Sequence, residues 1–116
     1  MEIYEKLKAW LEGLGFQISV EQCGKTPGSA GLYFLGQKEL KTREDLLGNR
    51  FRKVRYQFLL RLVMVPEEPM LLQCLQMCQE APKVGIRISE TAHKKEGSTG
   101  LYIYHIRLDV EREETI

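Results

Sequence analysis

Two cysteines in the second half of the chain, Cys74 and Cys78, lie one helical turn apart, so both side chains can reach one metal ion or each other. A zinc site needs four ligands, and the remaining candidates Cys23, His93 and His105 are scattered without a second pair at ligand spacing. Both cysteines also occupy apolar positions of a predicted helix, where a free cysteine behaves as a small hydrophobic residue. We therefore expect reduced thiols packed in the core, and no metal or other cofactor.

A second candidate is the run Gly24, Lys25 and Thr26, which matches the end of a phosphate-binding loop and follows a predicted strand. That motif requires a glycine five residues before Gly24, and Ser19 stands there instead. The glycine- and proline-rich residues 27–31 also replace the helix whose N-terminus would hold the phosphate. We interpret the match as accidental.

A third candidate lies on the polar face of the last predicted strand, where His105, Arg107 and Asp109 alternate. A histidine beside a carboxylate can act in acid/base catalysis, but nothing in the chain identifies a nucleophile. Ser98 sits at a hairpin tip without the flanking pattern of a nucleophile elbow. Mixed charges on an open sheet face are usually cross-strand pairs or solvated side chains. The sequence therefore predicts no enzyme.

The strongest pattern in the chain runs from Phe51 to Val65, where apolar residues recur at a strict period of two. This pattern predicts a strand with one buried face. The residues expected on the buried face are Val54, Tyr56, Phe58, Leu60, Leu62 and Met64, and those expected opposite are Lys53, Arg55, Gln57 and Arg61.

This strand is long for a domain of this size. At about 3.3 Å per residue it would span about 50 Å, whereas a compact domain of this length has a diameter of roughly 35 Å. One interpretation is that the strand starts later than Phe51 or bends at a bulge. The other is that one end leaves the core as the arm of a hairpin, which needs a partner surface such as a neighbouring subunit.

Around the central strand, apolar periodicity, glycine and proline mark the other elements. Helices are predicted at residues 2–13 and 69–81, and short strands at 16–20, 32–35, 84–88 and 102–110. In the second helix the expected core positions are Leu71, Cys74, Leu75 and Cys78.

Two polar segments are predicted to lie outside these elements. Residues 36–50 are expected to form a long charged loop, flexible or functional, in which Thr42 and Asp45 could start one helical turn ending near Gly48. Residues 111–116 are expected to form a frayed C-terminal tail.

The element order α-β-β-β-α-β-β predicts an α+β fold. We expect a single mainly antiparallel sheet of about five strands with both helices on one face. With 116 residues, the chain is expected to form one domain spanning 1–116.

Composition narrows the function classes. Hydrophobic content of 43% and charged content of 28% are ordinary for a globular protein, and no apolar run is long enough for a membrane helix. The N-terminal segment is amphipathic and unlike a secretory signal, so we expect a cytoplasmic product without membrane contact. The net charge of +1 is too small to attract the protein to nucleic acid or to an anionic membrane over a long range.

The basic residues of the central strand do not predict an RNA-binding sheet. Lys53 and Arg55 point away from the face that carries Tyr56 and Phe58, whereas stacking and phosphate contact require aromatic and basic side chains together. Asp109 and Glu111 of the last strand offer these cations partners in cross-strand pairs, within one subunit or across an interface.

As a whole the chain resembles the tail terminator, or tail-completion, proteins of long-tailed bacteriophages, sometimes labelled minor capsid proteins. The resemblance covers nearly the whole chain: an N-terminal helix from Ile3 to Leu14, a glycine-rich connection before LYFLG, a polar stretch, the long strand FRKVRYQFLLRLVM, a helix after Pro69 and a final hairpin ending in GLYIYHIRLDVE. The second helix departs from the family in carrying Cys74, Met77 and Cys78 in place of aliphatic residues.

The resemblance implies a structural, non-enzymatic role. Such proteins form a hexamer ring that caps the finished tail tube, stops its growth and presents a surface to the head connector. The implied partners are other copies of the chain, the tail tube protein and the head–tail connector protein. The implied location is the head-proximal end of the virion tail, and the host bacterial cytoplasm during assembly.

By the same likeness, loop 36–50 and the long strand would reach a neighbouring subunit. The basic residues that would face a neighbour, the tube end or the lumen are Arg50, Arg52, Lys53, Arg55 and Arg61. The alternative is a small non-enzymatic α+β binding or regulatory module that acts as a dimer. Formation of a ring, or addition to tail tubes, would support the tail-terminator function. A two-fold dimer that binds a small ligand would support the binding or regulatory module. Sequence-specific nucleic-acid binding is not expected, and it would appear as steeply salt-dependent affinity.

Overall fold

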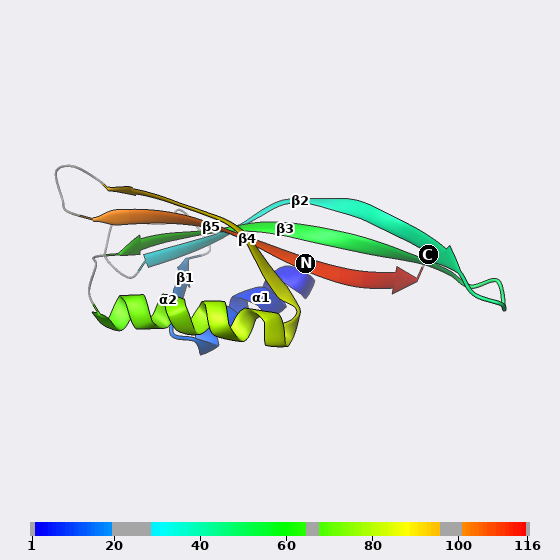
Figure 1. The fold of residues 1–116 in the computed structure, drawn as a ribbon, viewed down its shortest axis with the longest axis horizontal. Coiled ribbons are helices and arrows are strands. Elements are labelled where there is room, and N and C mark those ends of the chain that lie inside the picture. The colour runs from blue at the N-terminus through cyan, green and yellow to red at the C-terminus, as the bar shows by residue number, and fades with distance from the viewer. Residues whose placement is uncertain (1, 20–28, 65–67, 96–100, 116) are drawn as a thin grey trace.

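The computed structural model describes residues 2–19, 29–64, 68–95 and 101–115 of the chain. The elements run α1 (Glu2–Gly13), β1 (Gln17–Ser19), β2 (Ser29–Glu44), β3 (Arg50–Met64), α2 (Glu68–Glu80), the 3-10 helix η1 (Ala81–Val84), β4 (Ile86–Lys95) and β5 (Tyr102–Thr115). The strands form one sheet in the order β1-β2-β3-β5-β4, and both α-helices lie on the same face of it (Figure 1). The predicted α+β fold is confirmed, with one difference: β1 runs parallel to β2, while all other neighbours are antiparallel.

The core lies between the helices and one face of β3. All six β3 residues predicted to face inward, from Val54 to Met64 at every second position, are buried. Phe58 is at the centre: its ring lies 6.3 Å from that of Tyr4 on α1 and 5.4 Å from that of Phe34 on β2. The same helix is fixed to the sheet by the Tyr4 hydroxyl, which donates a 2.9 Å hydrogen bond to the Leu32 carbonyl. The period-two pattern therefore identified the buried face of β3 correctly.

The end of α1 is held against α2. Gly15 has a φ of 99°, a left-handed conformation that glycine adopts without steric cost, and it turns the chain so that Phe16 N–H bonds back to the Leu11 carbonyl at 3.2 Å. Gln73 of α2 donates a 3.1 Å hydrogen bond to the carbonyl of Leu14. A Cβ atom at Gly15 would stand 2.6 Å from the Gln73 amide nitrogen, so the two helices approach closely at this glycine.

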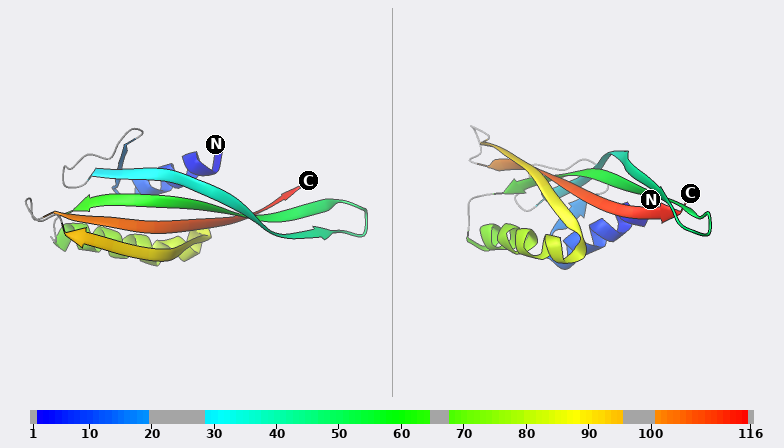
Figure 2. Two further views of the ribbon diagram at one scale, coloured as in Figure 1. Left: turned by 90° about the horizontal axis from the view of Figure 1, so that it is seen from above. Right: turned by 45° about the vertical axis from the view of Figure 1, so that its right-hand side comes forward.

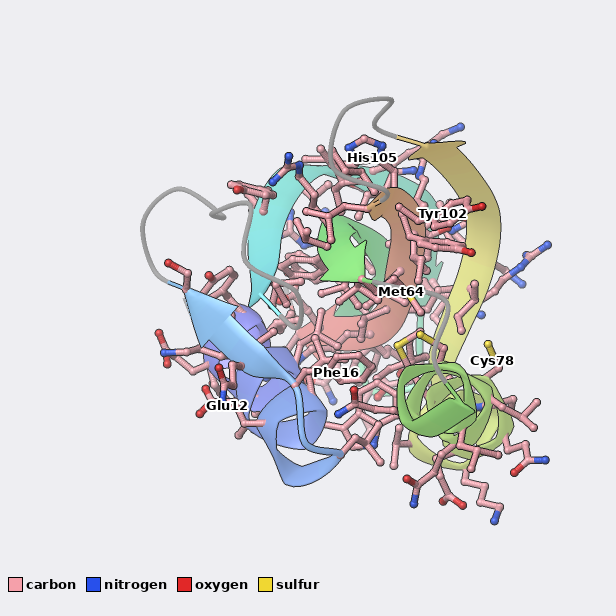
Figure 3. The ribbon with its side chains drawn as sticks, turned by 90° about the vertical axis from the view of Figure 1, so that its left-hand side faces the viewer. Glu12, Phe16, Met64, Cys78, Tyr102 and His105 are labelled. Carbon is pink, nitrogen blue, oxygen red and sulfur yellow. The ribbon has the colours of Figure 1, made fainter. Side chains whose placement is uncertain are left out.

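The prediction for the core face of α2 is partly wrong. Cys74 is half-buried against the core, but Cys78 and Leu75 are exposed, and the fully buried residue is Met77. Figure 3 shows Cys78 on the flank of the helix that lies beside β4. The helix carries apolar residues on more than one side, so spacing alone did not define which stripe faces the sheet. The side chain of Leu71, the fourth predicted core position, lies outside the described part.

The prediction of a charged loop at residues 36–50 is wrong. β2 continues to Glu44, and only residues 45–49 connect it to β3; the helical turn predicted at Thr42 is strand. The register between β2 and β3 shifts between Phe34 and Gly36 and again between residues 39 and 41. Each shift marks a β-bulge, which changes the face of the side chains that follow and breaks the alternation expected of a strand. Gly36, with a φ of 149°, stands at the first bulge.

The prediction of a frayed tail is also wrong. β5 extends to Thr115 and pairs with β3 as far as Phe51, so residues 111–115 are ordered strand. β4 starts at Ile86 and reaches Lys95, later at both ends than predicted, since Val84 belongs to η1. Cys23, the Gly24-Lys25-Thr26 run and Ser98 lie outside the described residues.

The molecule is elongated, with principal extents of 60 × 24 × 21 Å and a radius of gyration of 16.5 Å. A compact domain of this length has a radius of gyration of about 13 Å. Figure 2 shows the β2–β3 hairpin continuing past both helices. We call this extension the arm; it comprises residues 41–44 of β2, 45–49 of the turn, 50–53 of β3 and 113–115 of β5. Two interpretations were given for a strand longer than the domain: a later start or a bend, or an end that leaves the core in a hairpin arm. The structure has the hairpin arm.

We expect Phe58→Ala to lower the free energy of unfolding by about 3–5 kcal/mol, because the side chain is 0% exposed and its removal leaves a cavity at the centre of the core. Leu46→Ala at the tip of the arm is the control and should change stability by less than about 0.5 kcal/mol. Chemical denaturation followed by circular dichroism measures both. An equal effect of the two substitutions would show that the core is not centred on Phe58.

Candidate functional site

The residues with potential for chemistry are not assembled into a reactive site in the part that the structure describes. His105 and Asp109 share one face of β5, away from the helices, but they are four residues apart and hence roughly 13 Å along the strand. Asp109 is buried, and its carboxylate lies 3.7 Å from Nε of Arg107. Among the described residues, no three His, Cys, Asp or Glu side chains gather to hold a metal.

The two helix cysteines are both free, and the Cys74 thiol lies 4.0 Å from the Met64 sulfur in the core. Burial, with a smaller contribution from Cys78, raises the pKa of the Cys74 thiol. A raised pKa keeps this thiol protonated at neutral pH and lowers its nucleophilicity. The position of Cys74 therefore fits a packing role.

Four of the five basic residues predicted as interface positions lie on the arm or at its base. On the face away from the helices, Arg55 bonds to Glu111 at 2.9 Å, and Lys53 reaches the other oxygen of the same carboxylate at 3.2 Å. On the helix side, Arg52 lies 3.3 Å from Glu114. Arg50 is exposed where β3 leaves the turn.

Arg61 lies apart from this group. It is six residues further along β3 than Arg55, roughly 20 Å away, and is half-buried between Gly31 and His105 of the neighbouring strands. The structure thus brings Arg50, Arg52, Lys53 and Arg55 together but not Arg61.

Further ion pairs join the outer strands of the arm. Arg43 of β2 binds Glu113 of β5 through two nitrogens, with Nε 3.3 Å from Oε2, and its guanidinium lies 4.6 Å from the centroid of the Phe51 ring between them. On the opposite face the Tyr56 hydroxyl donates a 2.8 Å hydrogen bond to Glu114. The three strands of the arm are therefore linked by charged side chains on both faces.

These contacts change the acidity of the arm carboxylates. Hydrogen bonds from Arg55 and then Lys53 hold the pKa of Glu111 below its ordinary value, and the hydrogen bond from Arg43 lowers the pKa of Glu113. Each such surface pair contributes little stability alone, because both partners are solvated. No arm residue is buried, so the pairs and the backbone ladder take the place of a hydrophobic core there.

The turn at the end of the arm is fixed by Asp45. Its Oδ1 accepts hydrogen bonds of 2.9 Å from the backbone N–H groups of Leu47 and Asn49, and its Oδ2 accepts one of 3.0 Å from the Asn49 amide. The hydrogen bonds from Asn49 lower the pKa of the Asp45 carboxyl. This turn leaves Leu46 and Leu47 projecting into solvent, with relative exposures of 105% and 88%.

Sequence reasoning missed these two leucines. The signal was present: DLLGN places Asp, Gly and Asn around an apolar pair between two charged stretches, a composition typical of a hairpin turn.

The sheet also has open edges within the described residues. β1 covers β2 only at residues 29–31, so the rest of β2 has no neighbour on its outer side. β4 pairs with β5 only up to Val110, which leaves the outer edge of 111–115 open. Tyr33, Phe34 and Leu35 are exposed on the open part of β2. Open strand edges are sites where another chain can add to a sheet.

No family model matches the chain, and no curated protein sequence is significantly similar to it. Neither helix of the described part has the length and apolar character needed to cross a membrane.

We expect the arm to loosen below pH 4.5 and to stay unchanged between pH 7 and 5. A carboxylate whose pKa is lowered by folding stabilises the folded state above its unfolded pKa, near 4.5 for Glu111 and Glu113, and that stabilisation is lost as the pH falls through the folded pKa. Carboxyl NMR titration should give midpoints below 4.5 for both residues, and arm amides should exchange faster, relative to core amides, once those midpoints are passed. Midpoints at or above 4.5 would contradict the ion pairs. Glu111→Gln is the control: without this carboxylate, only the contribution of Glu113 to the change below pH 4.5 should remain.

Proposed function

We propose that this chain is a structural, non-enzymatic subunit of the phage tail terminator kind, which assembles with copies of itself into a six-membered ring, caps the tail tube and joins it to the head connector. The observation that carries the proposal is the arm, a three-stranded extension that leaves the core of a molecule 60 Å long. The resemblance in element order and strand length supports the same assignment.

An exposed arm without a core needs a partner. Small sheets are stable when one face is covered by apolar contacts, and the arm has charged side chains on both faces and no helix over either (Figure 2). A surface on a neighbouring subunit supplies the missing cover. The arm is therefore the part of the molecule best suited to reach another subunit.

The edges of the sheet support a cyclic assembly. The open edge of β2 and the open edge of β5 differ in sequence and in position, so a contact between unlike surfaces is available to each subunit. Contacts between unlike surfaces generate rings when the rotation between subunits closes. In such a ring the arm residues Arg50, Arg52 and Lys53, with Arg55 at the base of the arm, would lie near a neighbour or the tube end, and Arg61 would face a neighbour or the lumen from the central strand.

The partners in this proposal are other copies of the chain, the tail tube protein and the head–tail connector protein. The ring would stand at the head-proximal end of the tail in the virion, after assembly in the bacterial cytoplasm.

The first test is the native mass of the purified protein over a range of protein and magnesium concentrations, with negative-stain imaging of large species. Six-fold rings, or arrest of tail-tube growth by a monomer that closes its ring only on the tube, would support the proposal. A two-fold dimer that never grows and does not arrest tubes would instead support the dimeric binding or regulatory module.

We expect Arg55→Glu combined with Arg61→Glu to abolish ring formation and tube capping, because both substitutions reverse charge on the face of β3 turned away from the helices. Glu111→Gln is the matched control: it breaks the same intramolecular pair with Arg55 without reversing a cation, and should retain assembly. Sedimentation velocity and a tube-growth assay measure the outcomes. Normal assembly of the double variant would remove these two arginines from the interface, and loss of assembly in Glu111→Gln would show that Arg55 acts within its own subunit.

A further inference from the structure

The tip of the arm is the most exposed apolar feature of the described residues. Leu46 and Leu47 are adjacent, almost wholly exposed, and held there by the hydrogen bonds of Asp45. Leucines that are exposed at the end of a projection contribute little to the packing of their own subunit. Burial of these two side chains against an apolar surface would be favourable, because it removes them from water.

The same chain carries an apolar recess. A cleft of about 410 Å³ opens between α1 and η1, at the edge where β5 continues beyond β4. Its apolar walls come from Leu7 and Trp10 of α1, Val84 of η1 and Val110 of β5. Val84 is 52% exposed and Trp10 is only partly buried, so the cleft is accessible from solvent. Its volume lies in the range of about 300–1,000 Å³ that suits compact apolar groups.

The charges around the tip and the cleft are complementary. The carboxylates of Glu44 and Asp45 precede Leu46, with Arg50 beside Glu44, while Lys6, Arg112 and Glu111 line the cleft. Glu2 offsets part of this positive charge through its 3.0 Å pair with Lys6. Glu111 is itself bound by Arg55 and Lys53, which leaves Arg112 as the cation of the cleft without an ion pair among the described residues, and this cation favours a carboxylate at the tip.

We propose that Leu46 and Leu47 of one copy insert into the cleft between α1 and η1 of a second copy, with Trp10 and Val84 as the contact surface. The tip cannot fill the cleft of its own chain, because the turn stands at the far end of the long axis, well beyond the start of α1 (Figure 1). The proposal rests on the proposed function in taking the partner to be another copy. Projection and cleft are different surfaces, so the contact can repeat around a ring.

The test uses Trp10, the only tryptophan of the chain, as a reporter inside the cleft. On self-association of the wild-type protein its emission should shift to the blue, as water leaves the cleft. Leu46→Ser with Leu47→Ser should abolish the shift and weaken self-association by about 100-fold or more, since each buried leucine is worth about a factor of ten or more in Kd. The matched control is Leu72→Ser with Leu75→Ser, which removes two exposed leucines of α2 and should leave both readouts unchanged.

A mixing experiment tests the pairing itself. Val84→Glu blocks the cleft and places a carboxylate opposite Asp45, so this variant alone should not associate. The variant without tip leucines should not associate alone either. Mixed, the two should form a 1:1 dimer with a blue shift, because one supplies an intact tip and the other an intact cleft. Cys78→Glu, at an exposed residue lining the neighbouring cavity, is the control for the cleft and should associate normally.

The outcomes separate this inference from the proposed function. Three results would overturn the tip contact: rings that persist without the tip leucines, a mixture that does not dimerise, or a wild-type Trp10 emission that is independent of protein concentration up to about 1 mM. None of them would decide whether the protein caps tail tubes, which the tube-growth assay tests separately. Association that depends on the tip leucines but never arrests tail-tube growth would keep the tip contact and overturn the tail function.

Discussion

The pairing of β3 with β2 on one side and β5 on the other is the constraint on which the rest of the structure depends. β3 pairs with β5 from Phe51 to Met64, so a single strand crosses both the core and the arm. Its inward residues are buried from Val54 onward, where the helices cover them, and none is buried before it. One continuous backbone ladder therefore has two environments, and the boundary between them lies where the helix layer stops.

This division explains the distribution of charge. In the covered half, the helices supply apolar surface, and β3 can place its polar residues on the other face. In the uncovered half neither face has apolar cover, and both faces carry cross-strand ion pairs, such as Arg43 with Glu113 and Arg52 with Glu114. Pairs of this kind are weak in water, so the arm owes its order mainly to its continuity with the core strands. A weakly held extension can adjust to a partner at low energetic cost.

The sequence predicted the part of the fold that follows one period without interruption. The alternation from Val54 to Met64 identified the central strand and its buried face. The prediction failed where local geometry breaks the period. Two register shifts in β2 interrupt the alternation, so the strand residues from 36 onward were predicted to be a loop. In α2, apolar residues lie on several sides of the helix, so the spacing did not show that Met77 faces the core and Cys78 does not. For the candidate site, the sequence indicated the basic positions of β3 and also Glu111 of the last strand as an acidic partner, which its pairs with Lys53 and Arg55 confirm. The pair of Arg52 with Glu114 was not predicted, because residues 111–116 were expected to be a frayed tail.

The arm has the properties of an edge that is protected against indiscriminate pairing. Open strand edges attract other chains, and natural sheets limit this with charged side chains, which the arm contains, and with bulges, which β2 has just before the arm. Charge on the strands therefore suppresses unspecific addition along their length. The apolar surface of the arm is instead concentrated at Leu46 and Leu47, where the Asp45 turn fixes its direction. An apolar tip that is bordered by charges makes a selective contact. On a surface of the wrong shape the leucines would stay in water, and on a surface of the wrong charge like charges would face each other.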